Sequence, residues 1–510
     1  MTALRALWPP GRPPTSDLIA GLSVALVLIP QSLAYAELAG MPPERGLYAA
    51  AIPLLVAAPL ASSPYLQTGP VAVTALLTFG ALSTIAVPGS DAYVALGLAL
   101  ALIVGIVRLA AGLLRAGTIA YLLSQPMLLG FVPAAALLIL ASQLPGAVGA
   151  AAPDPGVLDG AVWALAHPGQ WEPTAVLLSL ATIALVLGGR RLHTLFPGVL
   201  VAVVGAIGLA ELIGYDGRLI GTIPIALPPL SADLPWDRLP ELLLPGVIIA
   251  LVGFAEPASI ARYFAALDRA RWSANREFVS QGAANVAAAF TGGFPVGGSF
   301  SRSSLNHLAG GRTRWAGAIT GLVVLAALPL VGVLEGLPRA VLAAIVIASV
   351  IPLLRLVPIA RLWAPSRPAF VVAASTFAVT ILSSPHVERG VLVGVGMSLA
   401  LHLWREMRVD VDDSLDDGIL HVRPRGVLWF VSAPALGDRL RDQLAAAPEA
   451  RGLCLHLDAI GRLDITAAVA LRALVDECAS AGLDVEIRGV QERDRRLIDG
   501  VVWSATPFGP

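Results

Sequence analysis

The sequence predicts an α-helical membrane protein that ends in a small α/β domain. Hydrophobic residues make up 56% of the 510-residue chain and charged residues only 14%, whereas soluble proteins average about 25% charged residues. The apolar excess lies between Asp17 and Trp404. There, stretches such as Ala92–Val107 and Arg314–Val333 approach or reach the ~20 residues that a bilayer-spanning helix needs.

The distribution of arginine predicts the orientation in the membrane. Cytoplasmic loops are enriched in Arg and Lys, and we place about fourteen spans with both chain ends in the cytoplasm. The chain contains no Lys. Most arginines of the apolar region, among them Arg108 and Arg262, then fall in loops that are predicted to lie inside. The loops predicted outside carry Arg45, Arg218, Arg238, Arg339 and Arg389. The segment Gly149–Pro173 contains no Arg and is expected to be an external loop.

Composition also sets the expected domain boundaries. Residues 1–16 are Pro-rich and lack the apolar core of a secretory signal peptide, so we expect a short cytoplasmic lead. Residues 17–404 are expected to form the transmembrane domain, with two related halves at about 17–215 and 240–404. Residues 405–418 are expected to be an acidic linker, and residues 419–510 the α/β domain. The predicted location is a bacterial inner membrane.

The C-terminal domain shows alternating strand and helix patterns, which predict a sheet covered by helices. The expected strands are Gly426–Ser432, Gly452–Leu457 and Leu483–Gly489, and the expected helices are Ala435–Ala447, Ile465–Ala481 and Glu492–Ile498. The only two cysteines, Cys454 and Cys478, both lie here. Their spacing is not typical of a zinc site, so we expect two reduced, packed thiols, and neither a metal nor a cofactor.

Two short segments interrupted by Gly and Pro occupy matching places in the two halves. Gln67–Val71 follows a span that contains Ile29–Glu37, and Phe294–Ser299 follows a span that contains Gly253–Pro257. An odd number of spans per half would invert the second copy. Paired interruptions of this kind indicate the midplane binding site of a transporter, although Gly and Pro are also simply common in membrane helices.

Half-helices that begin at these interruptions predict an anion site. The first N–H groups of a helix have no partner within the helix, and the helix dipole adds partial positive charge there. Half-helices starting near Pro70 and Ser299 would direct both positive ends at one point. Arg302 either adds its charge to this site or neutralises a carboxylate elsewhere.

Glu256 is a candidate for ion coupling, because a carboxylate inside an apolar span is costly and marks a functional site by default. A structural ion pair with Arg262 or Arg302 is the alternative. Two polar groups, Asn275–Phe278 and Gln281–Asn285, interrupt another small, apolar helix. We expect these polar groups to make contacts between helices rather than to bind substrate.

Two long motifs resemble the sulfate permease family of anion transporters. The first comprises Asp17–Gly21, Ile29–Ala36, Leu38–Pro42 and Gly46–Tyr48. The second comprises Asn275–Phe278, Gln281, Gly282, Asn285, Gly292–Ser303 and Gly311–Thr313. The C-terminal part resembles the STAS domain of the same family, so the resemblance extends from about Asp17 to Ile498.

The resemblance implies fourteen transmembrane segments in two inverted seven-segment repeats, which form a core and a gate domain. It implies an anion site between the third and tenth segments, alternating access and a homodimer. It also implies an acidic coupling position at Glu256. The implied substrate-binding residues are Gln31, Tyr35, Gly69, Pro70, Val71, Ser299, Phe300, Ser301 and Arg302.

Two positions depart from the family pattern. Val71 stands where some members carry Phe, which implies a wider site. Ile465 follows Asp464 where related bacterial anti-sigma antagonists carry a phosphorylatable Ser. We therefore expect the STAS domain to serve assembly, dimer contact or partner binding rather than a phosphorylation switch.

The functional hypothesis is a secondary transporter of sulfate, bicarbonate, chloride or a dicarboxylate, with proton symport favoured by Glu256. An exchanger, an anion channel, a Na⁺-coupled symporter and a membrane-anchored signalling protein are the alternatives. The expected partners are the anion, the coupling ion, membrane lipids and a second copy of the chain, with no nucleic acid. No catalytic or phosphate-binding motif is present, so we expect no enzyme activity.

Overall fold

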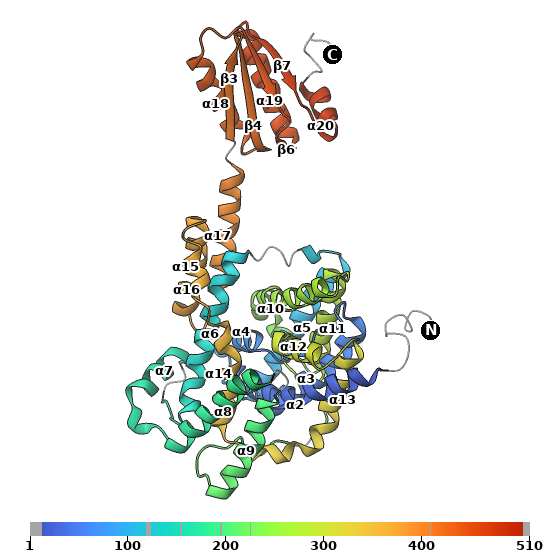
Figure 1. Ribbon diagram of the computed structural model, residues 1–510, viewed down its shortest axis with the longest axis vertical. Coiled ribbons are helices and arrows are strands. Elements are labelled where there is room, and N and C mark those ends of the chain that lie inside the picture. Colours follow the sequence, from blue (N-terminus) through green and yellow to red (C-terminus); the bar gives the residue numbers. More distant parts are fainter. Residues whose placement is uncertain are drawn as a thin grey trace. The chain divides into compact units, whose positions relative to one another are not determined.

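The protein divides into two compact units, residues 1–396 and residues 397–510. The computed structural model describes residues 13–118, 124–153, 156–193, 196–224, 226–407 and 410–502. The first unit is almost entirely helical (Figure 1). Its first helix begins at Thr15, within the lead expected at residues 1–16, of which residues 1–12 lie outside the described residues.

The first unit contains helices of very different lengths and two very short strands. Its first half contains α2 (Thr15–Leu38), α3 (Pro43–Leu60), β1 (Thr68–Gly69), α4 (Ala72–Leu82), α5 (Asp91–Leu113), α6 (Gln125–Ala147), α7 (Val157–Ala166), α8 (Pro173–Leu192) and α9 (Gly198–Ile213). Its second half contains α10 (Leu239–Leu267), α11 (Ala274–Phe290), β2 (Gly297–Gly298), α12 (Phe300–Leu308), α13 (Trp315–Ala327), α14 (Arg339–Val350), α15 (Val357–Arg361), α16 (Arg367–Leu382) and the start of α17 (Glu388–Glu406), which continues into the second unit.

Length and hydropathy qualify several of these helices to cross a bilayer. Within the described residues, six are both long and apolar enough: Thr15–Leu38, Asp91–Leu113, Gln125–Ala147, Trp236–Leu267, Trp315–Leu334 and Arg339–Arg361. Large apolar side chains stay exposed on the outer helices, for example Leu177 at 66% and Leu212 at 83%. Contact with lipid hydrocarbon explains such exposure, because lipid tails are as apolar as leucine.

One expectation about loops is wrong. The segment 149–173, expected to be an external loop, contains the short helix α7, and its external location stays a prediction. Arg108, expected in an inside loop, lies within α5 and is fully buried. Counting arginines treats each one as a solvated loop residue, and Arg108 instead finds backbone acceptors inside the protein.

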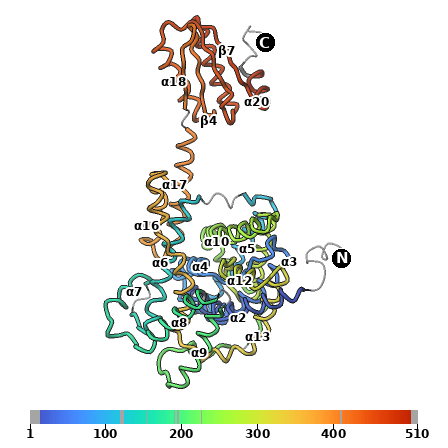
Figure 2. The backbone as a smooth tube through the Cα atoms, in the orientation of Figure 1, coloured from blue at the N-terminus to red at the C-terminus, as the bar shows by residue number. Residues whose placement is uncertain are grey.

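Glycines bring α5 and α11 into backbone contact, and the two helices lie side by side in Figure 1. Helix α10, which also packs against α5, is labelled beside it in Figure 2. A Cβ atom at Gly282 of α11 would lie 2.6 Å from the backbone nitrogen of Leu109. A Cβ atom at Gly112 of α5 would lie 2.7 Å from the carbonyl oxygen of Asn275. Small residues permit this close approach between membrane helices, which strengthens van der Waals packing.

The second unit contains a five-stranded sheet with helices. Its elements are β3 (Asp410–Asp416), β4 (Ile419–Leu428), α18 (Ala433–Ala446), β5 (Gly452–His456), β6 (Ile460–Leu463), α19 (Ile465–Ser480), β7 (Asp484–Arg488) and α20 (Glu492–Leu497). The strand order is β3-β4-β5-β7, with β6 paired to β4. Only the β3–β4 pair is antiparallel. Leu420, Leu453 and Leu471 are among the residues of its apolar core.

The prediction of an acidic linker at residues 405–418 is wrong in part, because residues 410–416 form the strand β3. This strand pairs with β4 through a two-residue turn, Asp417-Gly418, in which both residues have positive φ angles of 47° and 79°. Asp-Gly is the sequence signature of that hairpin turn. The signal was present, but the acidic composition of the segment obscured it. The start of β4 at Ile419 likewise precedes the expected strand, Gly426–Ser432.

Asp464 explains how the loop before α19 is held. Its carboxylate accepts hydrogen bonds from the backbone N–H groups of Ala467, at 2.7 Å, and Phe430, at 3.1 Å. Asp464 is therefore the N-cap of α19. The neighbouring Ile465 is 64% exposed.

Candidate functional site

The two interrupted segments meet in a two-stranded antiparallel ladder. Thr68 pairs with Gly298, and Gly69 pairs with Gly297. The Ser299 N–H extends the ladder by donating to the Gln67 carbonyl oxygen at 3.1 Å. These strands come from opposite halves of the unit, so the expectation that matching positions of the two halves share one place agrees with the structure.

Each strand is followed at once by a short helix. Helix α4 begins at Ala72, just after β1, and α12 begins at Phe300, just after β2. A two-residue strand is about 7 Å long, so both helices start within a short distance of the ladder. Because the strands are antiparallel, the chains leave the ladder at opposite ends. The positive ends of two half-helices are thereby gathered at one point.

Arg302, on the first turn of α12, links the two halves. Its side chain is fully buried. Nη1 donates to Oε1 of Gln31 at 3.4 Å, and Nη2 donates to the carbonyl oxygen of Pro70 at 2.9 Å. Among the described residues, no acceptor meets Nε. The structure thus brings Gln31, Pro70 and Arg302 together, with Arg302 contacting only neutral acceptors in these hydrogen bonds.

Gln31 and Tyr35 lie one turn apart on α2, and both are buried. Residues at this spacing share one face of a helix. The Tyr35 hydroxyl donates to Oγ of Ser349 at 3.1 Å, and Ser349 lies on α14. The face of α2 that carries Gln31 toward Arg302 therefore also contacts α14.

The start of α12 is capped by two side chains. Ser299 is the N-cap and accepts from the Arg302 N–H, while its hydroxyl lies 3.2 Å from that of Ser301. Oε1 of Glu256, on α10, accepts from the Phe300 N–H at 3.1 Å. A carboxylate at a helix N-terminus is stabilised by the helix dipole. Glu256 thus bonds to the backbone at the positive end of α12.

The Phe300 side chain points elsewhere. Its ring is 50% exposed and lies 6.0 Å, centroid to centroid, from the ring of Tyr263. Phe300 therefore contributes its backbone N–H, which donates to Glu256, and not its ring.

The start of α4 is built differently. Val71 is the N-cap residue and is buried, and no side chain among the described residues caps this helix. Gly69 lies beside Arg302, since a Cβ atom there would be 3.5 Å from Nη2. In α12, capping side chains accept from the first N–H groups. In α4, no described side chain does so.

Polar side chains of α11 hold the ladder in place, and sequence analysis assigned them only general helix contacts. Nε2 of Gln281 donates to Oγ1 of Thr68 at 2.7 Å. The Asn285 amide accepts from the Val296 N–H at 2.9 Å and donates to the Val296 carbonyl oxygen at 3.0 Å. These contacts reach β1 and the residue before β2 rather than another helix, so Gln281 and Asn285 position the two strands.

Arg108 is the buried cation that sequence analysis missed. It donates to three backbone carbonyl oxygens, those of Ala250 at 3.0 Å, Val296 at 2.8 Å and Ile249 at 3.2 Å. Gly253 permits this arrangement, because a Cβ atom there would lie 2.6 Å from Nη2. A second buried guanidinium therefore supports the residue that precedes β2. Its position inside an apolar run, at the end of Ala92–Val107, was the available signal.

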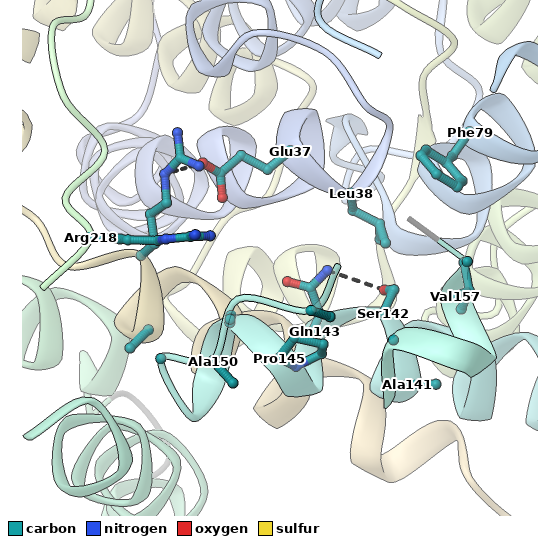
Figure 3. Close-up of a pocket in the computed structure, with 18 of the residues that line it drawn as sticks. Glu37, Leu38, Phe79, Ala141, Ser142, Gln143, Pro145, Ala150, Val157 and Arg218 are labelled. Atoms are coloured by element: carbon teal, nitrogen blue, oxygen red, sulfur yellow. Dashed lines mark hydrogen bonds and ion pairs between the residues drawn. The ribbon is translucent and has the colours of Figure 1, made fainter. Parts of the chain in front are cut away.

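A separate cavity of about 340 Å³ lies at the C-terminal end of α2. Glu37, Gln143 and Arg218 line it together in Figure 3. Arg339 lies 3.6 Å from the Glu37 carboxylate. Leu76 and Phe79 of α4 also line the cavity, but Gln31 and Arg302 do not. The cavity therefore adjoins the far part of α4 rather than the ladder.

Comparison with known proteins identifies the family to which this chain belongs. The model of the sulfate permease family matches residues 15–376, and the model of the STAS domain matches residues 411–501. The chain therefore belongs to the sulfate permease family of anion transporters, which are multi-pass membrane proteins, and it carries a STAS domain. The resemblance stated from the two sequence motifs is confirmed.

Individual relatives agree with this assignment. A Mycobacterium tuberculosis protein named "Probable sulfate transporter" is 35% identical over 401 residues, covering 77% of this chain and 70% of that protein. The chloroplastic sulfate transporter 4.1 of Arabidopsis thaliana is 30% identical over 511 residues, covering 92% of this chain and 74% of that protein.

Solved structures agree on the fold. The inward-facing structure of murine solute carrier 26 family member A9, an anion transporter, superimposes with a TM-score of 0.89 at 20% identity, covering 97% of this chain and 88% of that chain. The transmembrane domain of the cyanobacterial bicarbonate transporter BicA superimposes with a TM-score of 0.65 at 23% identity, covering 76% of this chain and 97% of that chain.

Proposed function

We propose that this protein is a secondary active transporter of small anions that binds its substrate between the N-terminal ends of α4 and α12. The observation that carries the proposal is the β1–β2 ladder, which gathers two helix N-termini around the buried Arg302. Relatives named as sulfate transporters support anion transport, and sulfate, bicarbonate, chloride and a dicarboxylate are the candidate substrates.

The two half-helices would contribute different groups to the bound anion. Helix α4 offers backbone N–H donors that no described side chain caps, whereas α12 offers the charge of Arg302. Gln31, Tyr35, Ser299 and Ser301 add neutral polar groups nearby. A site of neutral donors and one guanidinium suits a small anion, which exchanges water for directed hydrogen bonds.

The position of Glu256 suggests how proton uptake and anion binding are coupled. An ionised Glu256 places negative charge at the N-terminus of α12, where it opposes an incoming anion. Protonation removes that charge, so proton and anion each favour binding of the other. This mutual dependence is what a symporter requires. Symport therefore remains our proposal ahead of exchange, channel conduction or Na⁺ coupling.

The proposed fold and cycle follow the family. We infer fourteen segments in two inverted seven-segment repeats that form core and gate domains, with alternating access between them. The proposed setting is a homodimer in a bacterial inner membrane with both termini cytoplasmic. The cavity beside Glu37, Arg218 and Arg339 would then serve as the external approach to the site.

The test is anion uptake by the purified protein in liposomes under an imposed inward proton gradient. Labelled sulfate and a labelled dicarboxylate are the first substrates. Wild-type protein is expected to accumulate one of them, and Glu256→Gln to bind it without proton-driven accumulation. Glu241→Gln is the matched control, because Glu241 lies on the same helix in an exposed ion pair with Arg238.

The alternatives give different results. If only a Na⁺ gradient drives accumulation, the coupling ion is Na⁺ rather than the proton. Rapid equilibration without accumulation under either gradient would contradict symport and leave a channel or exchanger. Unchanged proton-driven accumulation by Glu256→Gln would exclude Glu256 from coupling. No movement of any candidate anion would overturn the proposed function.

A further inference from the structure

One face of the sheet in the second unit gathers histidine and cysteine side chains. β4 and β5 are parallel neighbours, and their register pairs His421 directly with Cys454. His456 follows two residues later on β5, so its side chain projects from the same face. Val422, which follows His421, and Leu455, which lies between Cys454 and His456, belong to the apolar core on the opposite face.

The potential ligand atoms of these residues converge. Nδ1 of His421 lies 3.0 Å from Nε2 of His456, and Sγ of Cys454 lies 3.4 Å from the same Nε2. All three atoms lie within 4.8 Å of one another. Zinc binds nitrogen at about 2.0–2.1 Å and sulfur at about 2.3 Å in tetrahedral geometry, which places neighbouring ligand atoms roughly 3.3–3.6 Å apart. Small side-chain rotations would bring the three atoms to this spacing.

The surroundings of these side chains carry charges of both signs. Glu486 of β7 is in register with Cys454 and supplies negative charge on the same face, where it pairs with Arg488. Arg423 adds the opposing positive charge.

We propose that His421, Cys454 and His456 form a binding site for a borderline-soft divalent cation such as Zn²⁺. One thiolate and two imidazoles are ligands that zinc prefers. Three protein ligands leave a fourth position, which would hold water. Cys454 is buried, and the two histidines are partly exposed. The site is independent of the proposed transport function, because all of its ligands lie in the second unit.

The competing explanation is a metal-free hydrogen-bonded network, in which one imidazole donates to the other and the thiol contacts His456. Both explanations use the same side chains, so the experiment must detect the metal itself. Cobalt(II) is a suitable probe, because it occupies zinc sites and gives tetrahedral d–d absorption together with a thiolate-to-metal band.

The experiment uses the full-length protein, purified in detergent and stripped of metal with a chelator. Zn²⁺ is titrated in competition with a fluorescent chelator, and Co²⁺ is titrated by absorption. The expected result is one site per chain, with tetrahedral bands and a thiolate-to-cobalt band that added Zn²⁺ removes. Cys454→Ser and His421→Gln are each expected to weaken binding by at least about 100-fold, because loss of a ligand exceeds the effect of an outer-shell partner.

Cys478→Ser is the matched control. Cys478 is the other cysteine of the chain and lies on α19, where it is buried in the apolar core. Retention of the thiolate band in Cys478→Ser assigns the ligand to Cys454 even if a ligand variant fails to fold. Absence of a stoichiometric site in the wild type, loss of the thiolate band in Cys478→Ser alone, or equal affinity in all folded variants would each overturn the proposal.

Discussion

The two half-helices α4 and α12 occupy equivalent places yet differ in chemistry. Each follows one strand of the β1–β2 ladder. Helix α4 has no capping side chain among the described residues, and apolar Val71 stands at its N-cap. Helix α12 is capped by Ser299, donates its first N–H, that of Phe300, to Glu256 and carries the buried Arg302. The backbone arrangement is repeated, but the side chains are not.

This difference teaches that the ladder sets the shape of both helix ends, while single residues set their charge and capping. Two uncapped helix ends alone would attract any anion. Here the α4 end offers backbone N–H donors, and the α12 end adds the charge of Arg302 and the carboxyl group of Glu256. Substitutions that remove or reverse the asymmetry should therefore have graded effects.

Removing the charge from α12 is expected to have the largest effect. Arg302→Gln retains a polar side chain but deletes the buried cation that contacts Gln31 and Pro70. Loss of one partner of a buried charged contact costs about 2–5 kcal/mol, so anion uptake should fall by at least about 30-fold. The measurement is the concentration dependence of uptake in liposomes.

Arg262→Gln is the control for this substitution, because Arg262 is exposed on α10, whereas Arg302 is fully buried. Equal uptake by Arg302→Gln and wild type would place the anion elsewhere. A comparable loss in both arginine variants would point to a general effect of charge on the membrane domain.

Making α4 resemble α12 is expected to have an intermediate effect. Val71→Ser places a capping hydroxyl at the α4 N-cap, where it would accept from the N–H groups that we assign to the anion. The KM for the transported anion should rise by about 3–10-fold, given a competing hydrogen bond of about 1 kcal/mol. Val71→Thr, which also introduces a hydroxyl, should behave alike, and Val71→Ala, which does not, should keep a KM near that of wild type. A KM unaffected by either hydroxyl would show that the α4 donors do not meet the anion.

Removing the side-chain cap of α12 is expected to have the smallest effect. Ser299→Ala deletes a cap that accepts from the Arg302 N–H, and such losses cost about 1 kcal/mol of stability. Thermal unfolding in detergent should show a slightly lower midpoint, with uptake changed less than in Val71→Ser. A loss of uptake as large as that of Arg302→Gln would instead assign Ser299 a direct role at the anion.

Much of this arrangement was predictable from the order of residues. Long apolar stretches require membrane helices, because an exposed backbone must satisfy its own hydrogen bonds in hydrocarbon. Interruptions at Gln67–Val71 and Phe294–Ser299 indicated the paired half-helices before any contact was known. By contrast, β3 was expected to be a linker, because its acidic composition masked an Asp-Gly hairpin turn.

The sequence by itself determined the membrane domain, the C-terminal α/β domain and the candidate residues at the half-helices. Only the tertiary structure decided which atoms meet: Arg302 with Gln31 and Pro70, Glu256 with the Phe300 N–H, and Arg108 with three carbonyl oxygens. The same holds for His421 and Cys454, which strand register brings together. Hydrophobic periodicity and turn chemistry act over a few neighbouring residues, whereas these contacts join residues far apart in the chain, and their geometry follows from how the helices and strands pack.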